Sequence, residues 1–106
     1  MPPSVRIATE TEAERGWWFD VEVDADAPGA RTLRVRIDWS DYEHWTRGKT
    51  PPSVAAEVLV RAALQLSPDA PLPATFDAAS LRRRLPGLDE RVRAELATDL
   101  RGLGRD

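Results

Sequence analysis

The first third of the chain alternates apolar and polar positions, which is the pattern of strands that bury one face. The clearest stretch is 17–24, where four apolar side chains share one face and the intervening residues share the other. The segment 33–39 repeats the pattern, and a weaker version begins at Val5 and ends in the acidic turn 12–16. The sequence therefore predicts a three-stranded antiparallel meander, with a loop over 25–31.

The same alternation predicts how the second and third strands pair. Placing Val23 opposite Leu33 brings apolar side chains together on one face and opposite charges together on the other. Each such cross-strand pair stabilises a sheet by roughly 0.2–1 kcal/mol, and a shift by one residue would bring valines opposite arginines. The further pairs that this register predicts are Val21–Val35, Phe19–Ile37, Trp17–Trp39, Glu22–Arg34 and Asp20–Arg36.

Capping residues and prolines indicate helices in the rest of the chain. Ser40 to Glu43 matches a capping box, so a short helix is predicted that ends near Gly48. Thr50-Pro51 predicts the start of a helix that runs to about Leu66. Most of the circumference of this helix is apolar, so we expect it to lie in the core.

The C-terminal third begins with the proline-rich stretch 67–74, which predicts an extended connector. Phe76 is expected to fix its end, and Asp77 to cap a short helix that stops at Pro86-Gly87. A last helix from Leu88 carries a narrow stripe of leucine and valine. The predicted fold class is α+β, a three-stranded antiparallel meander followed by three to four helices packed on one face.

Composition narrows the class of protein. The 106 residues fit a single globular domain that spans residues 1–106. Cysteine is absent, which excludes disulfides and thiolate nucleophiles. No apolar run approaches the roughly 20 residues that a membrane span needs, and the N-terminus lacks a signal-peptide pattern. We therefore expect a cytoplasmic protein with no membrane association.

Residues with catalytic potential are few. His44 is the single histidine, and the acids near it in sequence include Asp38 and Asp41. Consecutive residues of a helical turn point in different directions, so an ordinary surface histidine is favoured over a general base or a metal ligand. The glycines do not follow phosphate-loop spacing. No cofactor, metal or small-molecule ligand is predicted, and an enzyme centred on His44 is the least favoured alternative.

An arginine-rich segment is the candidate for contact with phosphates or an acidic partner. It comprises Arg82, Arg83, Arg84 and Arg91. The net charge of −3 has the wrong sign for a protein that mainly coats nucleic acid, and nearby acids can pair with these side chains within the helix. A nucleic-acid-associated regulator therefore remains an alternative rather than the leading hypothesis.

Four tryptophans are present, and Trp17 and Trp18 must lie on opposite faces of one strand. Trp18 leaves the main core, and it forms an exposed anchor, lies flat across Arg36, or is covered by the neighbours of the first strand or by the C-terminal helix. Exposed tryptophans are enriched in binding hot spots. The candidate contact surface is Trp18, Asp20, Glu22, Arg34 and Arg36. The leading hypothesis is a protein-binding or accessory module without intrinsic catalysis, whose partner is another protein or a second copy in a homodimer.

From Trp39 onward the arrangement of turns, caps and core positions resembles a small, uncharacterised bacterial protein family. In that family a strand leads to an acidic turn, a glycine, a Thr-Pro helix start, an apolar helix and a capped short helix. The matching residues are Tyr42, Trp45, Gly48, Thr50-Pro51, Val54 to Leu66, Phe76-Asp77, Leu81 and Leu85-Pro86. The resemblance implies a fold and no particular activity.

Overall fold

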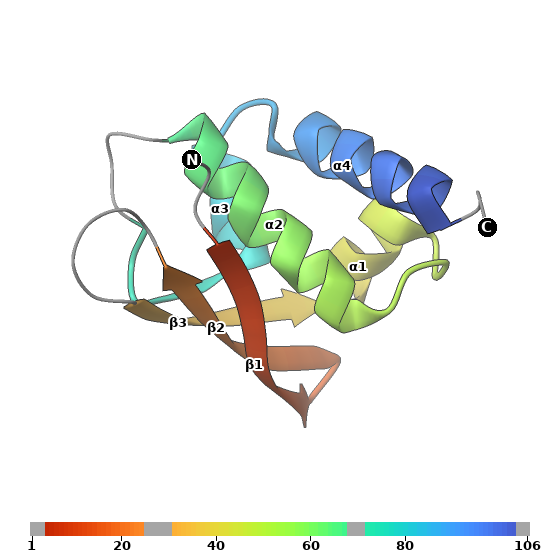
Figure 1. Ribbon diagram of the computed structural model, residues 1–106. Coiled ribbons are helices and arrows are strands. Elements are labelled where there is room, and N and C mark those ends of the chain that lie inside the picture. The colour runs from red at the N-terminus through yellow and green to blue at the C-terminus, as the bar shows by residue number, and fades with distance from the viewer. Residues whose placement is uncertain (1–3, 25–30, 68–71, 104–106) are drawn as a thin grey trace.

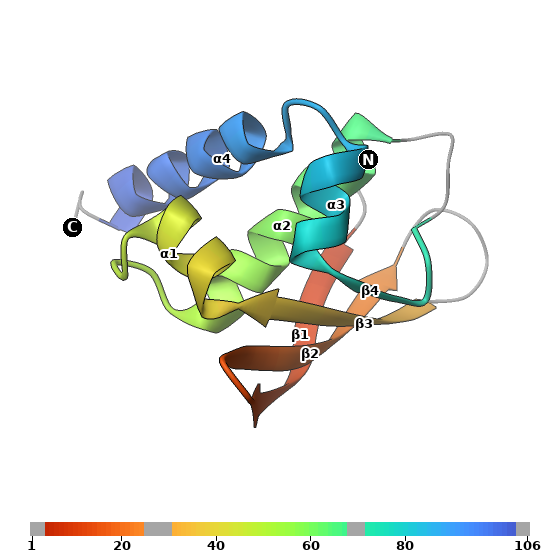
Figure 2. The same cartoon turned by 180° about the vertical axis from the view of Figure 1, so that it is seen from behind.

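The computed structural model describes residues 4–24, 31–67 and 72–103, the last range with side chains up to Ala97. Four strands form one sheet in the order β1-β2-β3-β4, and the helices cover one of its faces (Figures 1 and 2). The strands are β1 (Ser4–Ala13), β2 (Gly16–Asp24), β3 (Arg31–Asp38) and β4 (Thr75–Asp77). The helices are α1 (Trp39–Thr46), α2 (Pro52–Leu66), α3 (Ala78–Arg84) and α4 (Leu88–Leu103). The predicted α+β class, with an N-terminal antiparallel meander and helices on one face, is confirmed.

The core lies between the sheet and the helices. The strands contribute the apolar side chains of their covered face, and α2 contributes most of its circumference, as its composition predicts. The largest fully buried side chains are Phe19, Val21, Leu33, Val35, Ile37, Val58, Leu59, Val60, Leu81, Leu88 and Val92. The opposite face of the sheet has no helix over it in the described ranges, so its polar side chains remain accessible (Figure 1).

The predicted register of β2 and β3 is wrong by two residues. Leu33 lies opposite Val21 rather than Val23, and Arg36 lies opposite Trp18 rather than Asp20. A shift by two leaves every side chain on its predicted face, because the side-chain period of a strand is two. The observed register requires glycine at position 16, since a Cβ there would lie 2.3 Å from the carbonyl oxygen of Ile37.

The end of β3 also differs from the prediction. Trp39 does not continue the strand toward the core; it is the first residue of α1 and is 55% exposed. Its backbone N–H donates to the carbonyl oxygen of Arg15 at 2.8 Å, which turns the chain into the helix. The capping box predicted at Ser40 is wrong, because Asp38 occupies the N-cap position and no side-chain cap bond forms there.

The other helix boundaries follow the sequence more closely. α2 begins at Pro52, one residue later than predicted, with Pro51 as its N-cap. Asp77 caps α3 as predicted, since its carboxylate accepts from the backbone N–H of Ser80 at 2.6 Å. That hydrogen bond, reinforced by the Ser80 side chain, lowers the pKa of Asp77 below its ordinary value.

β4 was not predicted. It places Phe76 beside Val35 in a parallel pair, and the backbone N–H of Arg34 donates to the carbonyl oxygen of Ala74 at 2.7 Å. Phe76 is buried at the end of the connector, as expected. The predicted loop over 25–30, the proline-rich residues 68–71, and the side chains of the last turns of α4 lie outside the described residues.

Candidate protein-contact site on the open face of the sheet

Trp18 lies near the centre of the sheet face that no described helix covers. Its indole is half-buried, and the guanidinium carbons of Arg34 and Arg36 lie 4.8 and 5.9 Å from its ring centroid. Both distances fit cation–π contacts, which contribute about 0.5–1 kcal/mol at exposed sites. The indole is therefore neither bare nor core, but is flanked by two guanidinium groups from β3.

Asp20 and Glu22 lie on the same face as Trp18, but their side chains contact residues of β1 rather than residues of β3. The hydroxyl of Thr9 donates to Asp20 at 2.8 Å, and the guanidinium of Arg6 pairs with Glu22. Trp18, Asp20, Glu22, Arg34 and Arg36 are all brought together on this face, as the alternation predicts. The predicted pairs Glu22–Arg34 and Asp20–Arg36 do not form, because the register is shifted by two residues.

The two arginines beside Trp18 differ in how they are held. Arg36 donates to the Asp38 carboxylate at 3.0 Å and to the carbonyl oxygen of Glu14 at 2.5 Å. Arg34 is exposed, and within the described residues its guanidinium meets the indole of Trp18 but no carboxylate. The guanidinium of Arg34 is therefore available to donate hydrogen bonds to a carboxylate of a partner.

Trp39 is the surface residue that sequence reasoning missed. It borders a shallow depression of about 300 Å³ together with Arg15, Asp38 and Ser40, beside the open face of the sheet. Continuing the strand alternation through position 39 placed this side chain in the core. The helix-forming sequence that follows Asp38 is the signal that could have marked the end of the strand earlier.

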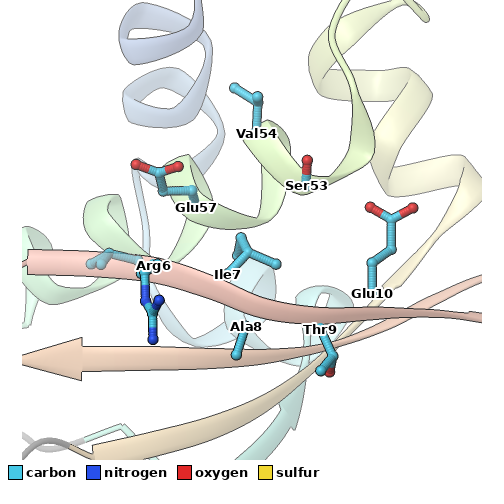
Figure 3. Close-up of a pocket in the computed structure, with 9 residues that line it drawn as sticks. Arg6, Ile7, Ala8, Thr9, Glu10, Ser53, Val54 and Glu57 are labelled. Atoms are coloured by element: carbon cyan, nitrogen blue, oxygen red, sulfur yellow. The ribbon is translucent and has the colours of Figure 1, made fainter.

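A second hollow lies between β1 and the first turns of α2 (Figure 3). It has a volume of about 520 Å³, and its walls include Ile7, Val54 and Ser53. The carboxylates of Glu10 and Glu57 border it from opposite sides, while Arg6 points to the other face of β1 (Figure 3). β1 is an edge strand, and its register shifts between Ile7 and Thr9, an irregularity that disturbs strand pairing along an exposed edge.

Arg82, the first of the three consecutive arginines, lies between helices rather than on an open surface. It forms a two-pronged pair with Asp89, at 2.9 and 3.0 Å, and donates to Asp41 at 2.7 Å. Asp41 is only 4% exposed, and the guanidinium also lies over the ring of Trp45 at 5.9 Å. Arg82 therefore links α1, α3 and α4.

This pairing determines the charge states of the group. Hydrogen bonding to Asp89 raises the pKa of Arg82. Burial alone would raise the pKa of Asp89, but hydrogen bonds from Arg82 and from the indole N–H of Trp45 outweigh it and hold that pKa below its usual range. Both partners are therefore charged at neutral pH.

The remaining arginines of the segment do not form one patch with Arg82. Arg83 and Arg84 are exposed on α3, and Arg83 donates weakly to the hydroxyl of Ser80 at 3.3 Å. Arg91 lies on α4 and donates to the side-chain oxygen of Gln65 at 2.8 Å. Arg82 therefore has a structural role between the helices, whereas Arg83, Arg84 and Arg91 are exposed.

His44 meets neither of the acids considered from the sequence. Asp38 pairs with Arg36, and Asp41 pairs with Arg82. The Nε2 atom of His44 lies instead 2.5 Å from the guanidinium of Arg93 and 3.5 Å from Asp89. Both contacts involve the same ring nitrogen of His44, so this side chain lies between a guanidinium and a carboxylate.

Comparison with known proteins returns no match from family models, curated proteins or solved structures. Among the described residues, no group of three or more His, Cys, Asp or Glu is arranged to hold a metal ion. No helix in the same residues is long and apolar enough to cross a membrane. The geometry of the side chains is therefore the basis for a functional proposal.

Proposed function

We propose that this chain is a small cytoplasmic protein-binding or accessory module without intrinsic catalysis, and that it contacts its partner through the open face of the sheet. The observation that carries the proposal is the position of Trp18. A large aromatic side chain lies on a polar face, outside the core, with an arginine beside it that lacks a carboxylate partner in the described residues. Tryptophan and arginine are the residues most enriched in binding hot spots.

The chemistry of this face indicates the kind of partner. Arg34 offers a guanidinium whose fork matches a carboxylate, and Trp18 offers apolar area next to it. The ion pair Arg6–Glu22 and the hydrogen bond from Thr9 to Asp20 lie on the same face and resemble the polar rim of an interface. A partner that presents an acidic side chain beside an apolar one fits this arrangement, and a second copy of this chain is one candidate.

The nucleic-acid alternative has less support from the contacts. Arg82 is already paired with two carboxylates, and the exposed Arg83 and Arg84 lie on α3 whereas Arg91 lies on α4. The overall charge of −3 also opposes contact with a phosphate backbone.

The test compares Trp18→Ala with Leu66→Ala, which removes an exposed apolar side chain on the helical side of the molecule. The wild type and both variants are used as bait in extracts of the source cells, and their solution mass is followed over a concentration series. We expect one identified protein, or self-association, to be retained by wild type and Leu66→Ala and lost by Trp18→Ala. Equal retention by all three folded proteins would contradict the proposal.

A further inference from the structure

Beyond the proposed protein contact, a third cavity lies between the C-terminal end of α1 and α4. Its volume is about 240 Å³. Arg47 and His44 line it from α1 and the following loop, Arg93 lines it from α4, and Trp45 and Leu96 supply apolar wall. No aspartate or glutamate lines this cavity in the described residues.

The two arginines of this cavity carry charges that no carboxylate balances within the described residues. The guanidinium of Arg93 lies 2.5 Å from Nε2 of His44, and the guanidinium of Arg47 has no hydrogen bond or ion pair there. Elsewhere arginines such as Arg61 and Arg82 pair with acids at 2.5 to 3.0 Å. Two uncompensated cations therefore meet at one concave surface of a protein whose net charge is negative.

The backbone at Arg47 makes glycine a suitable test substitution there. Arg47 has a φ of 54°, in the left-handed region where many helices end with glycine. Arg15 has the same conformation, with a φ of 60°, so a positive φ does not by itself mark a binding arginine. Glycine can replace either side chain without backbone strain.

Hydrogen bonds occupy three carbonyl oxygens near the end of α1, which borders the cavity. Those of Tyr42, Glu43 and Thr46 accept from the Thr46 hydroxyl, the Arg47 N–H and the Lys49 N–H. Thr50 also lines the cavity and is 6% exposed, and its hydroxyl has no hydrogen-bond partner in the described residues. The hydroxyl oxygen of Thr50 is itself inaccessible from the cavity, so the residue contributes wall rather than a contact to a bound group.

We propose that this cavity binds a small oxyanion, a phosphate or carboxylate group, between the guanidinium groups of Arg47 and Arg93. The size of the cavity suits a small anion rather than a drug-sized ligand, for which pockets of roughly 300–1,000 Å³ are usual. Apolar contact with Trp45 and Leu96 accommodates a short carbon chain attached to the anionic group. Guanidinium groups bind both oxyanions through charge-assisted hydrogen bonds.

The experiment titrates the full chain with inorganic phosphate and, separately, with succinate, against chloride at matched ionic strength, using calorimetry. We expect saturable binding of at least one of them. Binding of phosphate alone assigns the site to phosphate groups, and binding of succinate assigns it to carboxylates. Absence of saturable binding by either anion overturns the proposal.

Two matched pairs of variants test the assignment to this cavity. Arg93→Gln should weaken binding by about tenfold or more, the loss expected for one charge-assisted hydrogen bond, while Arg91→Gln on the same helix should not. Arg47→Gly should also weaken binding while keeping or raising the melting temperature, because glycine suits a positive φ. Arg15→Gly is its control, since Arg15 has a φ of 60° and lies away from the cavity. Equal weakening by Arg91→Gln or Arg15→Gly would overturn the proposal by showing an effect of net charge alone.

Discussion

Two arginine–tryptophan pairs occupy contrasting regions of this molecule. Between the helices, Arg82 lies over Trp45, whose ring is 5% exposed, and carboxylates hold the guanidinium on two sides. On the open face of the sheet, Arg34 lies over a half-buried Trp18 and meets no carboxylate in the described residues. The same two side-chain types are therefore satisfied within the fold at one place and incompletely satisfied at the other.

The charge of Arg82 therefore stabilises the fold, whereas the charge of Arg34 is available for binding. Removing one partner from the Arg82 cluster leaves a carboxylate such as Asp41 buried without a counter-charge, which is costly. Removing Arg34 leaves an indole that water already reaches. Stability measurements should therefore respond strongly to the first pair, and association measurements to the second.

The largest difference is expected between Trp45→Ala and Trp18→Ala. Truncating Trp45 opens a cavity in the core and removes the donor to Asp89, so the free energy of unfolding should fall by about 3–5 kcal/mol. Trp18→Ala should lower it by about 1 kcal/mol, since the lost contacts are on the surface. Urea unfolding at pH 7 measures both, and similar losses would show that the two rings have similar structural roles.

Arg82→Ala is expected to lower the free energy of unfolding by about 2–4 kcal/mol, because Asp41 and Asp89 lose their shared counter-charge. Arg83→Ala, the neighbouring exposed position, should change it by less than about 0.5 kcal/mol. Chemical denaturation of both variants distinguishes them. An equally small effect of Arg82→Ala would mean that the helix contacts hold without this bridge.

The carboxylate of Asp89, which pairs with Arg82, should make the free energy of unfolding depend on pH. Its pKa is lowered in the folded protein, so its stabilising contribution is present above the unfolded pKa, near 3.9, and is lost as the pH falls through the folded pKa. Asp89→Asn should lower stability by about 1–2 kcal/mol at pH 7 and leave a shallower decline below about pH 4. Melting temperatures between neutral and acid pH measure the slope, and a slope identical to that of wild type would contradict the role of Asp89.

Arg34→Ala should have a smaller effect on stability than Trp45→Ala or Arg82→Ala, below about 1 kcal/mol, because it removes one surface cation–π contact. Its effect on association should match that of Trp18→Ala if the two form one contact surface. The measurement is the solution mass across a concentration series, or retention of the identified partner. If Trp18→Ala loses association and Arg34→Ala does not, then Trp18 contacts the partner and Arg34 is not part of the contact surface.

The sequence predicts the faces of the strands well, because alternation depends on neighbouring residues alone. Trp17 packs against the ring of Tyr42 on the covered face, and Trp18 lies on the other, as the pattern requires. The alternation could not predict the register of β2 and β3, since a shift by two residues leaves every side chain on the same face. The register depends on Gly16 approaching Ile37, a contact between separate strands.

The functional difference between adjacent arginines could not be predicted either. Positions 82 to 84 are identical in sequence type, and only the positions of Asp41 and Asp89 in space make Arg82 structural. His44 likewise meets Arg93, which is 49 residues away along the chain. Asp77 shows the opposite case, because a cap bonds to its own helix and is visible in the local sequence.

The parallel pairing of β4 with β3 has consequences for the rate at which this chain folds and unfolds. The pairs β1–β2 and β2–β3 join strands that are adjacent in sequence, whereas β4 reaches the sheet only when the segment that carries α1 and α2 has closed. α3 follows β4 directly, so we expect the bridge made by Arg82 to form late in folding. Interactions absent from the folding transition state act mainly on unfolding, so this bridge should set how long the native protein survives rather than how quickly it forms.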